Sequence, residues 1–317
     1  MSRVRVARYS AEHKILWDDF VRSSKNGIFL FERDYLEYHA DRFPDYSLLF
    51  FDDAERLLAV LPATLKEDVL SSHAGLTFGG LVSTATMKVE LMLEVFEATR
   101  LYLQERDVAK VIYKAIPHIY HQLPAQEDLY ALFRYDARLF RRDVSSTLQM
   151  NQRPPFSKGR RYAIKVGRKH GIEVRRSLDF STFMSIEEHV LGSKYGVAPV
   201  HTAAEIGLLA ERFPENIKLF AAYKQEMLAG VIIYESAQVA HAQYIGVSEE
   251  GQRIGGLDLI MDHLIEVHYA DKKYFDFGIS TEDNGKYLNQ GLIKNKQSFG
   301  GRAVAYDFYE MNVPRKP

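Results

Sequence analysis

One order of predicted elements occurs twice along the chain, and this repetition limits the possible folds more than any other feature. In each half, helical patterns come before a β-hairpin, which is followed by a strand, a helix and a last strand. Elements in this order pack as a mixed sheet covered by helices. We therefore expect an α/β protein of the α+β type, with one mixed sheet in each half.

The repeated elements are predicted as follows. In the first half they are a hairpin at 46–51 and 57–65, a strand at 75–82, a helix at 87–103 and a strand at 111–116. In the second half they are helices at 159–170, 181–191 and 202–211, a hairpin at 217–223 and 229–236, a strand at 239–247, a helix at 257–269 and a strand at 274–277.

The stretch 151–159 separates the two halves. It contains two adjacent prolines, Pro154 and Pro155, and shows neither helical nor strand periodicity. A chain of 317 residues is also longer than a typical single domain. We therefore predict domains at 1–150 and 151–317.

Composition excludes some chemistry and leaves the rest open. The sequence has no cysteine, so it contains no disulfide, no catalytic thiolate and no cysteine-bound zinc. His118 and His121 lack the acidic partner of a helical metal motif, and we predict no metal site. The N-terminus is polar and no apolar run is long enough to span a bilayer, so we expect a cytoplasmic protein without membrane insertion.

A basic segment opens the second half. The formal net charge is only -1, yet nine Lys or Arg residues and a single acid, Glu173, lie between Arg153 and Arg176. If 159–170 is helical, Arg161, Lys165 and Arg168 lie on one face. This face is either a binding surface for phosphates or an ordinary solvated surface.

A glycine-bearing loop is predicted at 248–256, between the strand 239–247 and the helix that follows it. A loop that leads into a helix N-terminus offers free backbone N–H groups to an anion. The segment resembles the acyl-CoA loop of GNAT acyltransferases through Gln252, Gly255 and Gly256. Leu257 departs from that pattern, because a small residue is usual at its position. A plain strand-to-helix turn is the alternative.

The last fifty or so residues carry the most specific pattern. A Phe-Asp-Phe-Gly strand end at 275–278 is followed by a segment that contains Gly291, Leu292, Lys296, Phe299 and Gly300. This pattern resembles the FemABX-like transferases, a branch of the GNAT superfamily. Asn295 departs from it, since an aromatic residue usually precedes the lysine. The resemblance implies two tandem GNAT-like domains, with most of the site in the second.

The resemblance also implies roles for individual residues. Lys296 would lie near the reacting groups, where its charge could stabilise an oxyanion or a phosphate. The basic helix would face the phosphates of a nucleotide-linked precursor or the acceptor end of tRNA. Proton transfer would come from strand residues near the loop, among Tyr234, His241, Tyr244 and Asp276. Of these we select Tyr244 and Asp276, together with Lys296, as catalytic residues.

The function that follows is transfer of an acyl or aminoacyl group to an amine. By the resemblance, the donor is acyl-CoA or aminoacyl-tRNA, and the acceptor is an amine of a cell-envelope precursor, such as one of peptidoglycan, or of a related small molecule. The alternative is a non-catalytic GNAT-like module that binds a nucleotide-linked ligand or a nucleic-acid end. Detection of any acyl transfer would separate the two.

Overall fold

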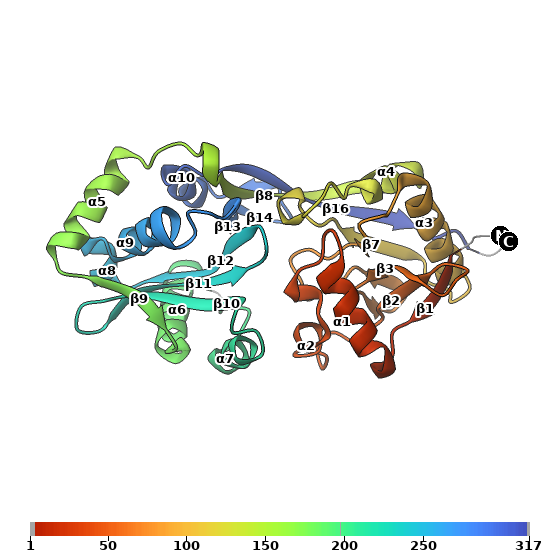
Figure 1. The fold of residues 1–317 in the computed structure, drawn as a ribbon. Coiled ribbons are helices and arrows are strands. Elements are labelled where there is room, and N and C mark those ends of the chain that lie inside the picture. The colour runs from red at the N-terminus through yellow and green to blue at the C-terminus, as the bar shows by residue number, and fades with distance from the viewer. Residues whose placement is uncertain (1–3, 197, 316–317) are drawn as a thin grey trace. The chain divides into compact units, whose positions relative to one another are not determined.

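The computed structural model describes residues 4–196 and 198–315, and its contacts divide the chain into two compact units (Figure 1). Unit 1 comprises Met1–Asp143, Asp283–Tyr287 and Ala305–Pro317, and unit 2 comprises Val144–Glu282 and Leu288–Val304. The chain passes from unit 1 to unit 2 inside one strand, β8 (Arg138–Gln149), and returns inside β16 (Arg302–Asn312). The domain boundary predicted at residue 150 does not account for the return of the chain to unit 1 inside β16.

Unit 1 contains an antiparallel sheet in the order β1, β2, β3, β6 and a further set of neighbouring strands, β4, β5, β7 and the end of β16. Its strands are β1 (Arg5–Arg8), β2 (Leu48–Phe51), β3 (Leu57–Leu61), β4 (Thr64–Lys66), β5 (Val69–Ser71), β6 (Val82–Ser83) and β7 (Lys110–Lys114). Its helices are α1 (Lys14–Ser23), α2 (Arg33–Leu36), α3 (Val89–Gln104) and α4 (Glu127–Arg134).

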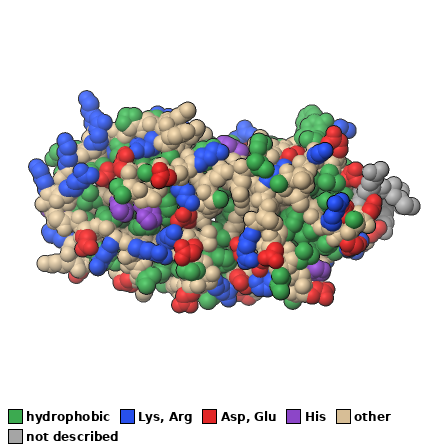
Figure 2. Space-filling view, in the orientation of Figure 1, with side chains coloured by type: hydrophobic (Ala, Val, Ile, Leu, Met, Phe, Trp, Pro, Cys, Tyr) green, Lys and Arg blue, Asp and Glu red, His purple; other side chains and the backbone are tan. Residues whose placement is uncertain are grey.

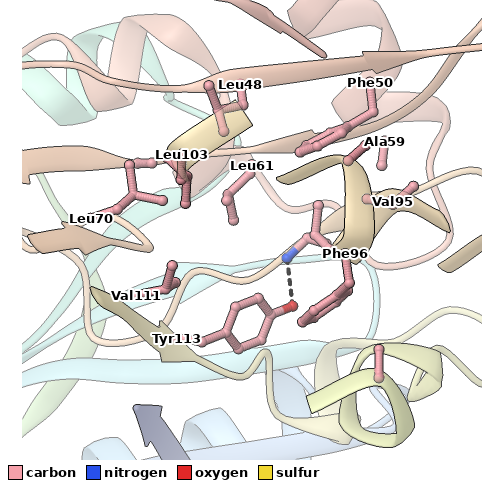
Figure 3. Close-up of a cluster of buried hydrophobic side chains, with 14 of the residues drawn as sticks. Leu48, Phe50, Ala59, Leu61, Leu70, Val95, Phe96, Leu103, Val111 and Tyr113 are labelled. Carbon is pink, nitrogen blue, oxygen red and sulfur yellow. Dashed lines mark hydrogen bonds between the residues drawn. The ribbon is translucent and has the colours of Figure 1, made fainter. Parts of the chain in front are cut away.

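The core of unit 1 forms where the apolar face of α3 packs on these strands (Figure 3). Val95 and Phe96 of α3 meet Leu48 and Leu61 of the sheet, all of them buried. The helix predicted at 87–103 is thus confirmed, and the buried side chains follow from its helical period.

The strand predicted at 75–82 is wrong, because only Val82 and Ser83 pair as a strand. The reason lies in Lys114 at the end of β7. Its buried ammonium donates hydrogen bonds to the carbonyl oxygens of His73, Ala74 and Leu76. Because these carbonyl groups, of which that of Leu76 lies in the predicted strand, all point to one cation, the chain is curved there and not extended as a strand.

Unit 2 contains one sheet in the order β8, β13, β12, β11, β10, β9, in which only the β12–β13 pair is parallel. Its strands besides β8 are β9 (Glu173–Ser177), β10 (Ile217–Tyr223), β11 (Met227–Glu235), β12 (Val239–Val247) and β13 (Tyr274–Ile279). The short strands β14 (Thr281–Glu282) and β15 (Tyr287–Leu288) pair as a separate two-stranded sheet. Its helices are α5 (Lys158–Lys169), α6 (Phe180–Tyr195), α7 (Ala203–Arg212), α8 (Glu249–Ile254), α9 (Gly256–His263) and α10 (Gln290–Ser298). The strands predicted at 217–223 and 239–247 are confirmed.

Helices cover both faces of this sheet. In Figure 1, α6 and α7 lie on one side of β10, β11 and β12, and α5, α8 and α9 lie on the other. The helix predicted at 257–269 ends as an α-helix at His263 and continues as a single π-helical segment, Leu264–His268. The segment 248–256, predicted as a loop, is mostly helical, because α8 begins directly after β12.

Phe183 anchors α6 on the sheet above two glycines. A methyl group added at Gly230 of β11 would lie 2.3 Å from the Phe183 ring, and one added at Gly246 of β12 would lie 3.1 Å from it. The ring therefore occupies space that only glycine leaves open. We call Gly230 and Gly246 the glycine socket.

We expect a Gly230→Ala substitution to lower the free energy of unfolding by about 1–3 kcal/mol, because the added methyl group forces Phe183 out of its position. Urea denaturation followed by circular dichroism measures the change. Gly207→Ala in α7 is the matched control, since a methyl group there meets nothing within 4 Å, and it should be neutral or slightly stabilising. Equal destabilisation by both substitutions would refute the socket.

Candidate active site

Several polar side chains lie together on one face of the unit 2 sheet, where β12 and β13 pair. Ala240 and Ala242 face the apolar core, so the alternation of a strand turns His241 to the opposite face. Phe275 and Phe277 likewise face the core on either side of Asp276. The register pairs His241 with Asp276 directly, which places both side chains on the same face.

The carboxylate of Asp276 is fully buried and accepts three side-chain hydrogen bonds. Ser145 and Thr147 of β8 donate to Oδ1, each at 2.6 Å, and His241 Nδ1 lies 2.7 Å from Oδ2. Burial by itself raises the pKa of Asp276, but the hydrogen bond and charge of His241 and the two hydroxyl donors outweigh it, so the pKa lies below its ordinary value. Asp276 is therefore an ionised carboxylate that only accepts hydrogen bonds.

This arrangement fixes how the imidazole is protonated. Because an ionised carboxylate has no proton to donate, His241 carries its proton on Nδ1 and donates it to Asp276. Whenever the ring is neutral, the lone pair is on Nε2, and 18% of the side-chain surface of His241 is exposed. An oriented imidazole with an accessible lone pair can act as a general base.

Lys296 of α10 holds the end of β13, which borders His241. It is 6% exposed, and its Nζ donates to the carbonyl oxygens of Gly278, at 2.9 Å, and of Ile279, at 2.6 Å. Gly278 has a φ of +75° and lies beside the His241 ring, since a methyl group there would be 3.4 Å from Cε1. Burial lowers the pKa of Lys296 to about 8, although the charge of Asp276 acts in the opposite direction. We call these five side chains, Ser145, Thr147, His241, Asp276 and Lys296, the His241 cluster.

Tyr244 lies on the same face of β12, past a bulge at Gln243. Its hydroxyl is 2.6 Å from His201 Nδ1 and accepts from the His201 backbone N–H at 3.2 Å. Burial raises the pKa of Tyr244 to about 12, so the phenol stays neutral. The hydrogen bonds of this hydroxyl thus link it to His201, and its catalytic role stays a prediction.

The turn that contains Gln252, Gly255 and Gly256 is closed by packing. A methyl group at Gly255 would lie 2.3 Å from the carbonyl oxygen of Ala163 in α5, and Gly255 and Gly256 are both buried. The Ser248 side chain already accepts from the backbone N–H of Gly251. The glycines therefore provide close packing between helices.

The cleft beside this turn is acidic. It has a volume of about 860 Å³ and is lined by Gln252 and by four carboxylates, Asp179, Glu226, Glu249 and Glu250. His189 is the one basic side chain in its described lining. A CoA diphosphate does not fit a closed turn next to carboxylates of the same sign. The assignment of Gln252, Gly255 and Gly256 to the donor remains a prediction that this packing does not favour.

The cationic face predicted on the first helix of the second half lies on α5. Arg161, Lys165 and Arg168 are exposed, and with Arg153 and Phe156 they line a hollow of about 300 Å³. Arg168 forms an ion pair with Asp262 at 2.6 Å. Figure 2 shows blue side chains gathered at the end of unit 2 where Figure 1 places α5. We call this the α5 surface.

The structure brings Lys296 and Asp276 into one cluster and leaves Tyr244 in a separate pair with His201. His241 was named from the sequence among the strand residues but not selected, and its position beside Asp276 follows from the parallel register of two strands. Ser145 and Thr147 lie in β8, and two hydroxyl residues at alternate positions of one strand are the signal that could have been noticed. His201 gave no signal in the sequence.

No family model matches the sequence, and no curated protein matches it. Solved structures do match. The crystal structure of FemX aligns with a TM-score of 0.68 at 10% identity, over 96% of each chain. L-PGS from Bacillus licheniformis aligns with a TM-score of 0.58 at 11% identity, over 90% of this chain and 93% of that one.

A third structure, a tandem GNAT protein from the clavulanic acid biosynthesis pathway, aligns with a TM-score of 0.50 at 11% identity, over 99% of this chain and all of the other. The chain has a FemABX-like GNAT fold. It contains two GNAT-like domains with mixed sheets, as the sequence predicted. At these identities the likeness to FemX concerns the fold alone.

The described residues of this FemABX-like fold form neither a metal site nor a membrane span. Within residues 4–196 and 198–315, no three His, Asp or Glu side chains are grouped so that they could hold a metal ion. Among the helices in those ranges, none combines the length and apolar character needed to cross a bilayer.

Proposed function

We propose that the protein transfers an acyl or aminoacyl group from an activated ester to an amine, with His241 as the general base. The His241–Asp276 pair carries this proposal, because a buried carboxylate orients the imidazole and leaves Nε2 able to accept a proton. The fold supports the same class of reaction, since the compared structures include a tandem GNAT protein.

These groups account for each bond and each proton of the transfer. The amine nitrogen attacks the carbonyl carbon and a C–N bond forms, while Nε2 of His241 takes a proton from the nitrogen. The C–O bond of the ester then breaks, and Nε2 returns the proton to the leaving oxygen. Asp276 stabilises the imidazolium between the two steps. Lys296 holds the carbonyl groups of Gly278 and Ile279 in place beside the ring.

We propose aminoacyl-tRNA as the donor in preference to acyl-CoA. The acidic cleft and the closed turn disfavour a diphosphate beside α8. The α5 surface offers exposed cations, and Tyr162, elsewhere on the same helix, has an aromatic ring that is 70% exposed. Cations with an exposed ring suit a nucleic-acid strand, whose phosphates and bases they contact together. As acceptor we propose an amine of a cell-envelope precursor.

The test is a transfer assay with two donors. Purified protein is incubated with aminoacyl-tRNA or with acetyl-CoA and a panel of amine acceptors, which includes amine-bearing peptidoglycan precursors, and amide products are measured by mass spectrometry. We expect products with aminoacyl-tRNA. If tRNA binds but neither donor reacts with any acceptor, the non-catalytic binding module is the better description.

Charge reversal on the α5 surface should weaken tRNA binding. We expect the triple variant Arg161→Glu, Lys165→Glu and Arg168→Glu to lose at least about tenfold in affinity at low salt, since several phosphate contacts disappear together. The difference should shrink as salt rises. Filter binding across a salt series measures it.

A matched control changes the net charge equally at lysines that are not part of α5. Lys66, Lys224 and Lys286 are exposed, and their replacement by glutamate should cost far less affinity. An equal loss in both triple variants would mean that only the net charge matters, and normal binding by the α5 variant would make its face an ordinary solvated surface.

A further inference from the structure

A carboxyl group is sealed between α6 and the sheet of unit 2. Glu187 is 6% exposed, and its Oε2 has no hydrogen-bond partner in the part of the chain that the structure describes. A methyl group at Gly246 would lie 2.9 Å from that oxygen, so the carboxyl lies directly over the backbone of β12. Among the described residues no cation pairs with this oxygen, so a charge on it would be buried without compensation.

The same helix is held down by Phe183, one turn earlier, in the glycine socket. Phe183 and Met184 are fully buried, while the helix positions facing away from the sheet, such as Glu188, are exposed. The docking of α6 therefore combines an apolar anchor with an acid that has to stay uncharged. These two contributions respond differently to pH, because only one of them can ionise.

The groups that face Glu187 do not offset a negative charge. From β12 the titratable group is Tyr244, a phenol that stays neutral and shares its hydroxyl with His201. From α7 it is Glu205, whose charge acts on Tyr244 with the same sign as that of Glu187. At the closest approach β11 presents Gly230, which has no side chain. Burial is the cause that raises the pKa of Glu187 to about 7.

We propose that Glu187 is a protonation latch, which keeps α6 docked on β11 and β12 while its carboxyl is neutral and loosens the helix when the carboxyl ionises. The helix forms a wall of the acidic cleft through Thr182, Ser185, Ile186, His189 and Val190. Loosening it therefore changes access to that cleft. This inference does not depend on the proposed transfer reaction.

The direction of the effect follows from linkage. A carboxyl whose pKa is higher in the docked state than in water contributes stability to docking at low pH, and this contribution is lost as pH rises through the docked-state pKa. Between the pKa of an exposed glutamate, about 4.3, and the docked-state value, each pH unit favours the opened state by a further factor of up to ten, and above the docked-state value the effect levels off. Between pH 6 and pH 8.5 the opening of α6 should increase by up to about tenfold.

Hydrogen exchange of the α6 backbone amides at pH 6 and pH 8.5, corrected for intrinsic exchange rates, measures this opening. We expect wild-type protein to lose protection at the higher pH and Glu187→Gln to keep it. Glu188→Gln is the matched control, because it removes the same charge from an exposed position of the same helix, and it should behave as wild type.

The proposal is overturned if wild-type protection is the same at both pH values, or if Glu188→Gln abolishes the response as well. Should Glu187→Gln fail to fold, carboxyl infrared spectroscopy of the wild type with isotope-labelled glutamate decides the matter. A buried carboxyl that is already ionised at pH 5 would contradict the latch, and one that ionises near pH 7 together with the loss of protection would support it.

Discussion

A His241→Ala variant is expected to lose about 10²- to 10⁴-fold in transfer rate, which is the range that a general base contributes. The expectation rests on the orientation of the ring, since Asp276 holds Nδ1 and leaves Nε2 to accept the proton of the amine. Some loss of stability is expected as well, because the imidazole is partly exposed but its removal takes one hydrogen-bond donor from the buried carboxylate of Asp276. Single-turnover kinetics with aminoacyl-tRNA measure the chemical step.

A control variant and a measurement of stability show whether the loss of rate is specific to His241. His170→Ala removes an exposed histidine at the end of α5 and should leave the chemical step unchanged. Denaturant unfolding of both variants reports any loss of structure. A folded His241→Ala protein with normal single-turnover rates would contradict the assignment of the base, and Tyr244 with His201 would become the next pair to test.

Much of unit 2 could be predicted from the sequence because its strands carry long apolar runs with clear limits. The residues of β12 alternate between core and opposite face, and the strand was predicted with its actual bounds. In unit 1 the prediction failed at 75–82, where glycines and short apolar residues looked like a strand. The carbonyl group of Leu76, together with those of His73 and Ala74 just before it, binds Lys114, a contact between distant residues that no local pattern contains.

The residues of the site, like the strands, could be predicted only where a local sequence pattern contains them. Asp276 and Lys296 were found through a local motif, and the structure joins them through Gly278 and Ile279. The pairing of His241 with Asp276 depends on the register of two parallel strands, which the sequence does not specify. The glycine pattern at 255–256 was assigned to phosphate binding, whereas the structure shows contact with α5, because a small residue is equally useful to a ligand and to a neighbouring helix.

Replacement of Lys296 by methionine is expected to lower turnover about a hundredfold and also to destabilise unit 2. Methionine keeps much of the length of the side chain but donates no hydrogen bond, so the carbonyl groups of Gly278 and Ile279 lose their partner. Each unsatisfied buried carbonyl costs about 1–3 kcal/mol. The end of β13 beside His241 would then move, and the imidazole would no longer be held in one position. Turnover has to be measured below the unfolding transition, so that loss of fold is not counted as loss of catalysis.

The pH dependence separates a buried ammonium from an ordinary surface lysine. Because burial lowers the pKa of Lys296 to about 8, the folded protein releases this proton before the unfolded chain does, whose lysine titrates near 10.5. Between these values the unfolded state binds more protons, so the stability of wild type relative to Lys296→Met should rise with pH, by up to about 3 kcal/mol. The neutral amine can still donate to both carbonyl groups, which is why the contact survives deprotonation. Urea titrations of both proteins from pH 7 to pH 10.5 measure the difference, and comparison with the variant cancels the contribution of Lys114. A difference that stays constant over this range would show that Lys296 is solvated.

Lys296→Arg should recover part of the stability but little of the turnover, because a planar guanidinium cannot place its donors on both carbonyl groups in the space that one ammonium occupies.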